Sequence, residues 1–235
     1  MTMFDLTGRI AVVTGGNGGI GLGMARGLAA AGAGVVVAAR NGEKAAAAMA
    51  ALGSESAFIA LDVADESSCR AMIAQAADRF GRLDILVNNA GTSIRKPPET
   101  YTAAEWHAVL DTNLTGAFLC SQAAHPVMKR SGGGKIINIG SMFALFGSAY
   151  AAPYAASKGA LVQLTKSLAA AWAADDIQVN AILPGWIDTE LTRDARHRSQ
   201  ACTSECWPAP PPAAGAFPTT SRASLSSSPP PPQIS

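Results

Sequence analysis

Residues 14–21 of the chain read TGGNGGIG, and this stretch decides the fold that the sequence predicts. The apolar run at 10–14 before it favours a buried strand, and the helical periodicity at 19–31 after it favours a helix. Glycines let the backbone turn tightly and approach a pyrophosphate, and the helix N-terminus supplies free N–H donors. Structural turns also use glycine, but a strand before the loop and a helix after it favour dinucleotide binding. The residues expected to contact the cofactor here are Gly15, Asn17, Gly19, Ile20 and Gly21.

From this loop to about residue 196, short β-branched runs alternate with longer alanine-rich stretches. Strands are predicted at 10–14, 34–39, 56–62, 83–88, 135–141 and 178–184. Helices are predicted at 19–31, 41–52, 67–80, 103–129 and 153–174. This order predicts an α/β fold of Rossmann type, with a doubly wound parallel sheet and right-handed crossovers. We therefore assign residues 1–196 to a single dinucleotide-binding and catalytic domain.

The composition is that of an ordinary globular protein and points to no polymeric partner. Of 235 residues, 49% are hydrophobic and 15% charged, and a net charge of +1 offers no footprint for nucleic acid or a membrane surface. No apolar run is long enough to span a bilayer, and no signal-peptide pattern begins the chain. Four irregularly spaced cysteines and three scattered histidines indicate neither a disulfide framework nor a metal site. We expect a cytoplasmic protein without a bound metal.

The end of the second predicted strand bears on which dinucleotide binds. An acidic residue there would accept hydrogen bonds from the adenosine ribose hydroxyls of NAD and would repel a 2′-phosphate. This chain has Ala38, Ala39, Arg40 and Asn41 instead. The planar guanidinium of Arg40 can hold a phosphate, although a solvated arginine at a strand end is the alternative. The sequence favours NADP(H), and NAD(H) stays open.

A tyrosine and a lysine four residues apart carry the predicted chemistry. Tyr154 and Lys158 lie in a stretch of helical period, so both side chains project from one face. A free tyrosine has a pKa of about 10 and is a poor acid–base catalyst near neutrality. The Lys158 cation, together with the positive nicotinamide ring of an oxidised cofactor, is expected to lower the pKa of Tyr154. Ser141 ends the preceding strand and is placed to hydrogen-bond a substrate carbonyl oxygen.

Taken together, these motifs resemble the short-chain dehydrogenase/reductase superfamily in its compact form. The resemblance covers residues 4–196 and rests on the order and spacing of the loop 14–21, Asp62-Val63, Asn88-Asn89-Ala90-Gly91, Asn113, Ser141, Tyr154 with Lys158, and Pro184-Gly185. It implies an NAD(P)-dependent oxidoreductase that transfers a hydride between a nicotinamide cofactor and a carbonyl or secondary alcohol. In that reaction Tyr154 would be the general acid for reduction or the base for oxidation.

The resemblance also implies roles for residues that pattern alone does not single out. Asp62 would hydrogen-bond the adenine, and Val63 would line its pocket. Asn113 would keep a water in a proton relay to Lys158, which would also hold the nicotinamide ribose. Further cofactor contacts are implied for Asn89, Ala90, Gly91, Pro184, Gly185, Ile187 and Thr189. The implied catalytic set is Asn113, Ser141, Tyr154 and Lys158, and the intact family form implies a homo-oligomer, either a dimer or a tetramer.

The loop after the fourth predicted strand, residues 92–98, bears on the substrate, because ligands bind at the carboxyl edge of such sheets. Its Arg95 and Lys96 could attract a carboxylate, and the loop resembles that of gluconate 5-dehydrogenases and related sugar-acid reductases. Two solvated loop cations are an equally good interpretation. A 3-oxoacyl-(acyl carrier protein) reductase is the first alternative, since it shares the catalytic set and would dock an acidic carrier on surface cations.

The pattern stops after residue 196, and residues 197–235 form a Pro- and Ser-rich tail whose composition predicts disorder. Cys202 and Cys206 within it lack partner histidines for a zinc site. Plausible codons for residues 216–228, read from the third base of the first codon, translate as VPDDFAGIAVFL, which resembles a C-terminal helix of the family. We therefore hypothesise that the tail is the family's own segment in the wrong frame. A cofactor-binding remnant without turnover follows as an alternative to an active enzyme.

Overall fold

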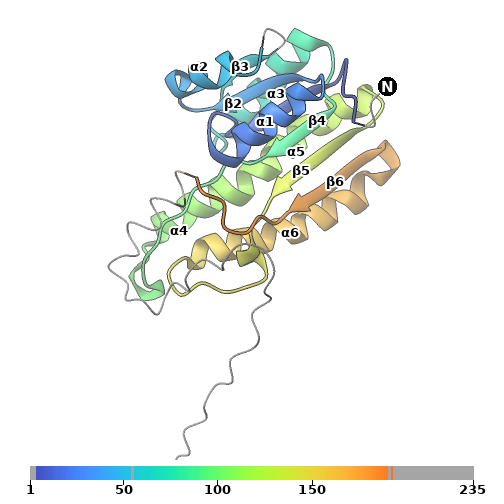
Figure 1. Ribbon diagram of the computed structural model, residues 1–235. Helices are drawn as coiled ribbons and strands as arrows, with labels where there is room; N and C mark the ends of the chain where they lie inside the picture. Colours follow the sequence, from blue (N-terminus) through green and yellow to red (C-terminus); the bar gives the residue numbers. More distant parts are fainter. Residues whose placement is uncertain (1–3, 54–55, 190–191, 193–235) are drawn as a thin grey trace, which may run out of the picture. The chain divides into compact units, whose positions relative to one another are not determined.

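One parallel sheet forms the centre of the protein (Figure 1), whose computed structural model describes residues 4–53, 56–189 and 192. Its strands are β1 (Ile10–Thr14), β2 (Gly34–Ala39), β3 (Ala57–Ala60), β4 (Ile85–Asn88), β5 (Gly134–Ile139) and β6 (Ile177–Ile182). Their order across the sheet is β3-β2-β1-β4-β5-β6, and every neighbouring pair is parallel. The predicted doubly wound parallel sheet is confirmed. The tail at 197–235, with its proposed boundary, lies outside the described residues.

The helices lie between the strands in the predicted alternation. They are α1 (Gly19–Ala30), α2 (Gly42–Ala50), α3 (Glu66–Phe80), α4 (Ala103–Leu110), α5 (Gly116–Arg130) and α6 (Ala152–Trp172). Short 3-10 turns are η1 (Pro98–Thr100), η3 (Met142–Ala144) and η4 (Ala173–Asp175). The single helix predicted at 103–129 is wrong in one respect, because the π-helical turn η2 (Asp111–Thr115) separates α4 from α5.

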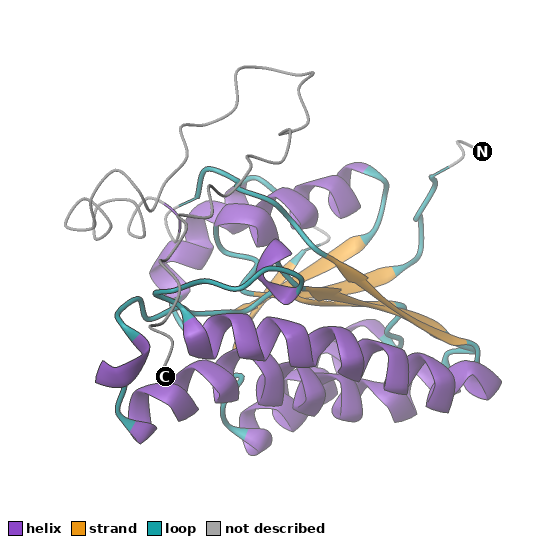
Figure 2. Cartoon of the chain, turned by 90° about the horizontal axis from the view of Figure 1, so that it is seen from below, coloured by secondary structure: helices purple, strands orange, loops and turns teal. Residues whose placement is uncertain are grey.

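Helices cover both faces of the sheet (Figure 2). On one face Met72 of α3, Met128 of α5 and Leu168 of α6 pack in a core that includes Val12 of β1. On the other face Val13, the next residue of β1, packs in a second core with residues of α1 and β2. Because β1 and β2 are buried on both faces, they read in the sequence as continuous apolar runs rather than as alternating ones.

The topology places the functional segments at one edge of the sheet. Strands β1 and β4 are neighbours in the sheet, and the strand order reverses direction between them. Loops that follow the carboxyl ends of strands at such a switch point form the usual ligand site of an open α/β sheet. At the opposite end, Asp84 accepts hydrogen bonds from Arg9 Nη1 (2.8 Å) and from the backbone N–H of Ile10 (2.9 Å), which fixes β1 against β4.

Candidate active site

The glycine loop after β1 is tied to the end of β4 by hydrogen bonds. Asn89 Nδ2 donates to the carbonyl oxygens of Thr14 (3.0 Å) and Gly15 (3.2 Å). Thr14 Oγ1 in turn accepts from the backbone N–H groups of Asn89 and Ala90, both at 3.0 Å. A Cβ at Gly21 would lie only 2.4 Å from Gly15 O and from Asn89 Nδ2. Gly21 therefore packs behind the loop and, unlike the other predicted loop contacts, lines neither of the two cavities found there.

The first of these, which we call the loop cavity, lies between the glycine loop and the ends of β2 and β3. The predicted cofactor contacts that line it are Gly15, Asn17, Gly19, Ile20, Arg40, Asp62, Val63, Asn89, Ala90, Gly91 and Thr189. Lys44 and Thr112 also line it, and the sequence motifs singled out neither. Asp62 lies just beyond β3, where its Oδ1 accepts a hydrogen bond from the backbone N–H of Ala64 (3.1 Å).

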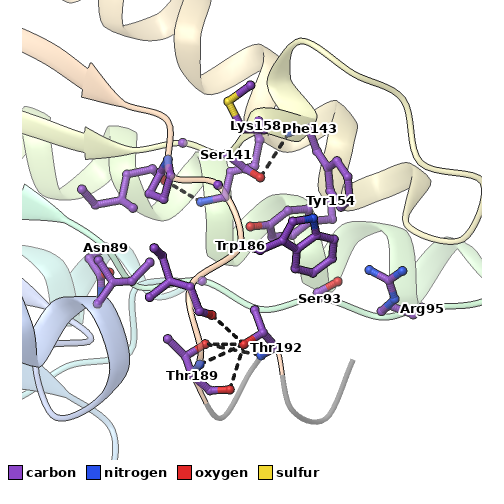
Figure 3. Close-up of a pocket in the computed structure, with 18 residues that line it drawn as sticks. Asn89, Ser93, Arg95, Ser141, Phe143, Tyr154, Lys158, Trp186, Thr189 and Thr192 are labelled. Atoms are coloured by element: carbon purple, nitrogen blue, oxygen red, sulfur yellow. Dashed lines mark hydrogen bonds between the residues drawn. The ribbon is translucent and has the colours of Figure 1, made fainter. Parts of the chain in front are cut away.

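The second, the tyrosine cavity, brings together three of the four predicted catalytic side chains (Figure 3). Tyr154 and Lys158 project into it from α6, and Ser141 lies where the chain leaves β5. The Ser141 hydroxyl accepts a hydrogen bond from the backbone N–H of Phe143 at 3.2 Å. Phe143 stands edge-on to Tyr154 and to Trp186, with ring centroids 6.2 and 5.9 Å apart, so one wall of the cavity is aromatic. The predicted residues Pro184, Gly185, Ile187 and Thr189 complete the lining.

The two cavities adjoin along the carboxyl edge of the sheet. Ile20, Asn89, Gly91 and Thr189 line both. Thr189 belongs to the segment after β6, and its Cγ2 would lie 3.3 Å from a Cβ at Gly19, so this segment lies against the glycine loop. The arrangement suits an extended ligand that reaches from the glycine loop to the tyrosine.

Burial sets the protonation of the tyrosine–lysine pair. Lys158 Nζ donates to Ile139 O at 2.6 Å and lies 5.6 Å from the centre of the Tyr154 ring. Burial lowers the pKa of Lys158 to about 8. Burial raises the pKa of Tyr154. The hydrogen bond with the Ser141 hydroxyl and the charge of Arg95 lower it, but by less. The sequence predicts a lowered Tyr154 pKa from Lys158 and an oxidised nicotinamide together; in the cofactor-free chain the pKa is raised instead, because the loss of hydration outweighs the Ser141 hydrogen bond and the Arg95 charge.

The fourth predicted catalytic residue, Asn113, is buried in the π-helical turn and lines neither cavity. Its Oδ1 accepts from the backbone N–H of Thr92 (2.8 Å), and its Nδ2 donates to Thr92 O (3.0 Å) and to Ser157 Oγ (3.1 Å). Ser157 Oγ donates to Tyr154 O at 2.7 Å. Asn113 thus joins the loop after β4 to the helix that carries the tyrosine. The water relay through Asn113 stays a prediction. Ser157, which the sequence motifs did not single out, contributes to the link between Asn113 and α6.

The neighbouring cations of the loop after β4 have different surroundings. Lys96 forms an ion pair with Glu105 at 2.5 Å and lies 5.2 Å from the centre of the Tyr101 ring. Arg95 lines the tyrosine cavity, and its buried Nε has no hydrogen-bond acceptor among the described residues. The Arg-Lys pair that the sequence suggested for a carboxylate is therefore divided between an internal ion pair and the cavity.

Comparison with known proteins identifies the family. The family model for short chain dehydrogenases matches residues 9–200. The chain belongs to that family. It is accordingly an NAD(P)-dependent oxidoreductase that acts on a small molecule, as the sequence predicted.

Individual short chain dehydrogenases resemble the chain over most of its length. A tropinone reductase homolog of Arabidopsis thaliana is 40% identical over 80% of this chain and 73% of its own length. Gluconate 5-dehydrogenase of Gluconobacter oxydans is 38% identical over 81% of this chain and 75% of its own. The crystal structure of a gluconate 5-dehydrogenase from Burkholderia cenocepacia, in complex with NADP and tartrate, has 44% identity and a TM-score of 0.77, covering 81% and 76% of the two chains.

The residues of the loop cavity fit the dinucleotide that short chain dehydrogenases use. Gly18 is the N-cap of α1 and no side chain caps this helix, so the first-turn N–H groups are available to a pyrophosphate. Arg40 and Lys44 supply positive charge to the lining of the cavity. Lys158 and Thr189 lie where the nicotinamide half would reach the tyrosine cavity. When bound, the cofactor supplies or accepts the hydride.

The two described cysteines and His125 lie outside both cavities. Cys69 of α3 and Cys120 of α5 are buried thiols whose sulfur atoms lie 3.5 Å apart. His125 forms a contact of 2.8 Å with Asp175 and stacks near Trp172. No group of three metal-ligating side chains occurs among the residues that the structure describes, and no helix there is long and apolar enough to cross a membrane.

Proposed function

We propose that the chain interconverts a keto sugar acid and its hydroxy form with NADP(H), using Tyr154 as the general acid–base and Ser141 and Lys158 beside it. Three observations support this proposal. Ser141, Tyr154 and Lys158 converge on one cavity; Arg95, whose buried Nε has no acceptor among the described residues, lines the same cavity; and no acidic residue stands at the end of β2. The second observation carries the choice of substrate.

The tyrosine cavity divides the chemistry among three side chains. The Ser141 hydroxyl donates a hydrogen bond to the substrate carbonyl oxygen, and the Tyr154 hydroxyl gives that oxygen its proton as the alcohol forms. A raised Tyr154 pKa keeps the phenol protonated at neutral pH, which suits the reductive direction. Lys158, whose pKa is about 8, is mostly charged at pH 7 and stabilises the phenolate left behind.

Arg95 supports an acidic substrate. A buried donor without an acceptor costs about 1–3 kcal/mol, and Arg95, whose buried Nε has none among the described residues, lines the tyrosine cavity, so its guanidinium favours a ligand that supplies acceptors. A carboxylate does so with charge-assisted hydrogen bonds. The solved gluconate 5-dehydrogenase that resembles this chain holds tartrate, which is also an organic acid. A sugar acid places its carboxylate at Arg95 and its carbonyl at Tyr154.

The cofactor preference rests on the end of β2. Ala38 and Ala39 precede the exposed Arg40, and no carboxylate stands there to accept hydrogen bonds from an adenosine ribose. Arg40 can pair with a 2′-phosphate. We therefore propose NADP(H) as the preferred cofactor.

The substrate proposal can be tested with three carbonyl compounds and two variants. NADPH consumption by the full chain is followed with 5-ketogluconate, with a neutral ketose of the same carbon number, and with an acetoacetyl thioester. Arg95→Leu should raise KM for 5-ketogluconate about ten- to a hundred-fold, the equivalent of a charged hydrogen bond. It should leave the neutral ketose unaffected. Arg79→Leu, an exposed arginine outside both cavities, is the matched control.

The outcomes separate the candidate functions. A preference of the unmodified chain for the thioester indicates a 3-oxoacyl-(acyl carrier protein) reductase and contradicts the sugar-acid proposal. Equal losses for the acid and the neutral ketose in Arg95→Leu exclude a carboxylate contact. Homo-oligomerisation stays a prediction, and light scattering of the purified chain measures it directly.

A further inference from the structure

A lysine from helix α2 lies on the rim of the loop cavity against the glycine loop. Lys44 is the third residue of α2, 26 positions after Gly18 in the sequence. A Cβ placed on Gly18 would lie 3.2 Å from Lys44 Cε and 3.4 Å from its Nζ. The lysine stem therefore occupies the space that a side chain at position 18 would need, and its ammonium group ends at the loop.

The cap of α2 fixes this placement. Asn41 Oδ1 accepts a hydrogen bond from the backbone N–H of Lys44 at 2.9 Å, which holds the first turn of the helix. Asn17 Nδ2, from the glycine loop, donates to Asn41 O at 3.4 Å. The loop and the helix cap are thereby linked, and both asparagines line the cavity with Lys44.

The two cations that line this cavity suit an anionic ligand with more than one negative charge. Arg40 and Lys44 both line the cavity, one just after β2 and the other in the first turn of α2. Among the described residues that line it, Asp62 is the only carboxylate, and it belongs to the segment after β3. Glu43 of the same first turn does not line the cavity. A phosphomonoester carries between one and two negative charges near pH 7 and accepts hydrogen bonds on three oxygens.

We propose that Lys44 is a second specificity-determining cation, which together with Arg40 holds the 2′-phosphate of NADP(H). This inference rests on the proposed preference for NADP(H) and deepens it. Arg40 offers a planar fork, and Lys44 offers a point charge from a different element, so the two can contact different oxygens of one phosphate. Gly18 contributes to this phosphate site, because the absence of a side chain there leaves room for the aliphatic part of Lys44.

Binding of cofactor fragments tests the inference independently of catalytic turnover. Isothermal titration calorimetry compares 2′,5′-ADP, which has the 2′-phosphate, with 5′-ADP, which lacks it. Lys44→Ala should weaken 2′,5′-ADP about ten-fold, because it removes one charge-assisted contact that is partly screened by solvent. Binding of 5′-ADP should be unchanged, and Lys44→Arg should retain most of the affinity. Lys166→Ala, an exposed helical lysine of α6 outside both cavities, is the control.

Each remaining outcome overturns a particular statement. Equal weakening of both ligands by Lys44→Ala places the lysine on a phosphate that the two ligands share, and no weakening of either makes it a surface lysine. Both results contradict the inference. If Arg40→Ala weakens 2′,5′-ADP and Lys44→Ala does not, the cofactor preference stands and only the role of Lys44 fails. If the unmodified chain binds 5′-ADP as tightly as 2′,5′-ADP, the preference for NADP(H) itself fails.

Discussion

The loop cavity and the tyrosine cavity adjoin, yet they are built on different physical principles. At the loop cavity the backbone matters most: glycine is required where a Cβ would meet the loop or Asn89, and the cations beside it are exposed. At the tyrosine cavity the side chains matter most: Lys158 is buried and bound to a backbone carbonyl, and the half-buried Arg95 has a buried Nε without an acceptor among the described residues. The backbone of the loop cavity is shaped to fit a ligand, whereas the tyrosine cavity contains side chains whose hydrogen bonding a bound ligand would complete.

The largest effect is expected at the tyrosine itself. Tyr154→Phe removes the proton donor and keeps the ring that packs on Phe143, so kcat should fall by about 10²–10⁴-fold. The affinity for NADPH, measured by fluorescence titration, should change little, because the loop cavity is untouched. A Phe variant with nearly normal kcat removes Tyr154 from the mechanism.

The buried lysine gives a prediction about stability and pH. Burial lowers the pKa of Lys158 from 10.5 to about 8, so near pH 7 the folded chain carries a charge that it would hold more easily when unfolded. Lys158→Met should therefore raise the free energy of unfolding near pH 7, by on the order of 1–3 kcal/mol, while abolishing turnover.

The sign of the pH dependence follows from the same shift. Between pH 8 and pH 10.5 the unfolded chain binds more protons at this residue than the folded chain does, so the wild-type protein gains stability as the pH rises. The advantage of the Met variant should shrink across that window in urea titrations of the cofactor-free protein. An advantage that stays constant with pH means that the charge of Lys158 is not its cause.

A pair of glycines in α1 isolates the backbone requirement of the loop cavity. Gly21→Ala places a Cβ 2.4 Å from Gly15 O and Asn89 Nδ2, so it should destabilise the fold by about 1–3 kcal/mol and weaken both NADPH and NADH. Gly23→Ala lies on the same helix with nothing within 4 Å of its Cβ, so it should stabilise by about 0.5–1 kcal/mol. Thermal unfolding and cofactor titration measure both; similar effects of the two substitutions contradict the close approach.

The smallest effect is expected from the ion pair that anchors the loop carrying Arg95. Glu105 pairs with Lys96, whose backbone N–H also donates to Tyr150 O at 3.0 Å. Glu105→Gln should raise KM for the keto acid about two- to five-fold and leave kcat unchanged, as expected for a partly exposed ion pair. Glu99→Gln, on the neighbouring turn η1, is the control.

The pKa of Glu105 is lowered to about 2, chiefly by its hydrogen bond with Lys96. The pair therefore persists throughout pH 5–8 and is lost only as the pH falls toward 2, so the KM difference should be independent of pH in the assay range. A difference that disappears toward pH 5 contradicts this anchoring.

Sequence reasoning succeeded where a local pattern imposes a local structure. Buried parallel strands, the glycine loop and the spacing of Tyr154 and Lys158 depend on neighbours a few residues away, and the structure places them as predicted. It could not foresee the π-helical turn around Asn113, because nothing in the helical period of residues 103–129 shows the contact with Thr92 that this turn allows.

The adjacent cations Arg95 and Lys96 show the same limit. Their difference depends on Glu105, which also forms the capping box of α4 with Thr102. The pairing of Glu105 with Lys96 could be seen only in the fold. The role of Lys44 could not be predicted for the same reason, since only the packing of α2 brings this lysine close to Gly18. The raised pKa of Tyr154 in the cofactor-free chain could not be foreseen, because burial is a property of the folded chain.

The most direct test of the account is the initial rate of NADPH consumption by the full chain with 5-ketogluconate as the carbonyl substrate. The account predicts a rate that saturates in both NADPH and the keto acid, because the two adjoining cavities bind the two reactants for one reaction. Tight binding of NADPH with no consumption, for the keto acid, the neutral ketose and the thioester alike, would contradict it and would leave a cofactor-binding remnant as the better description.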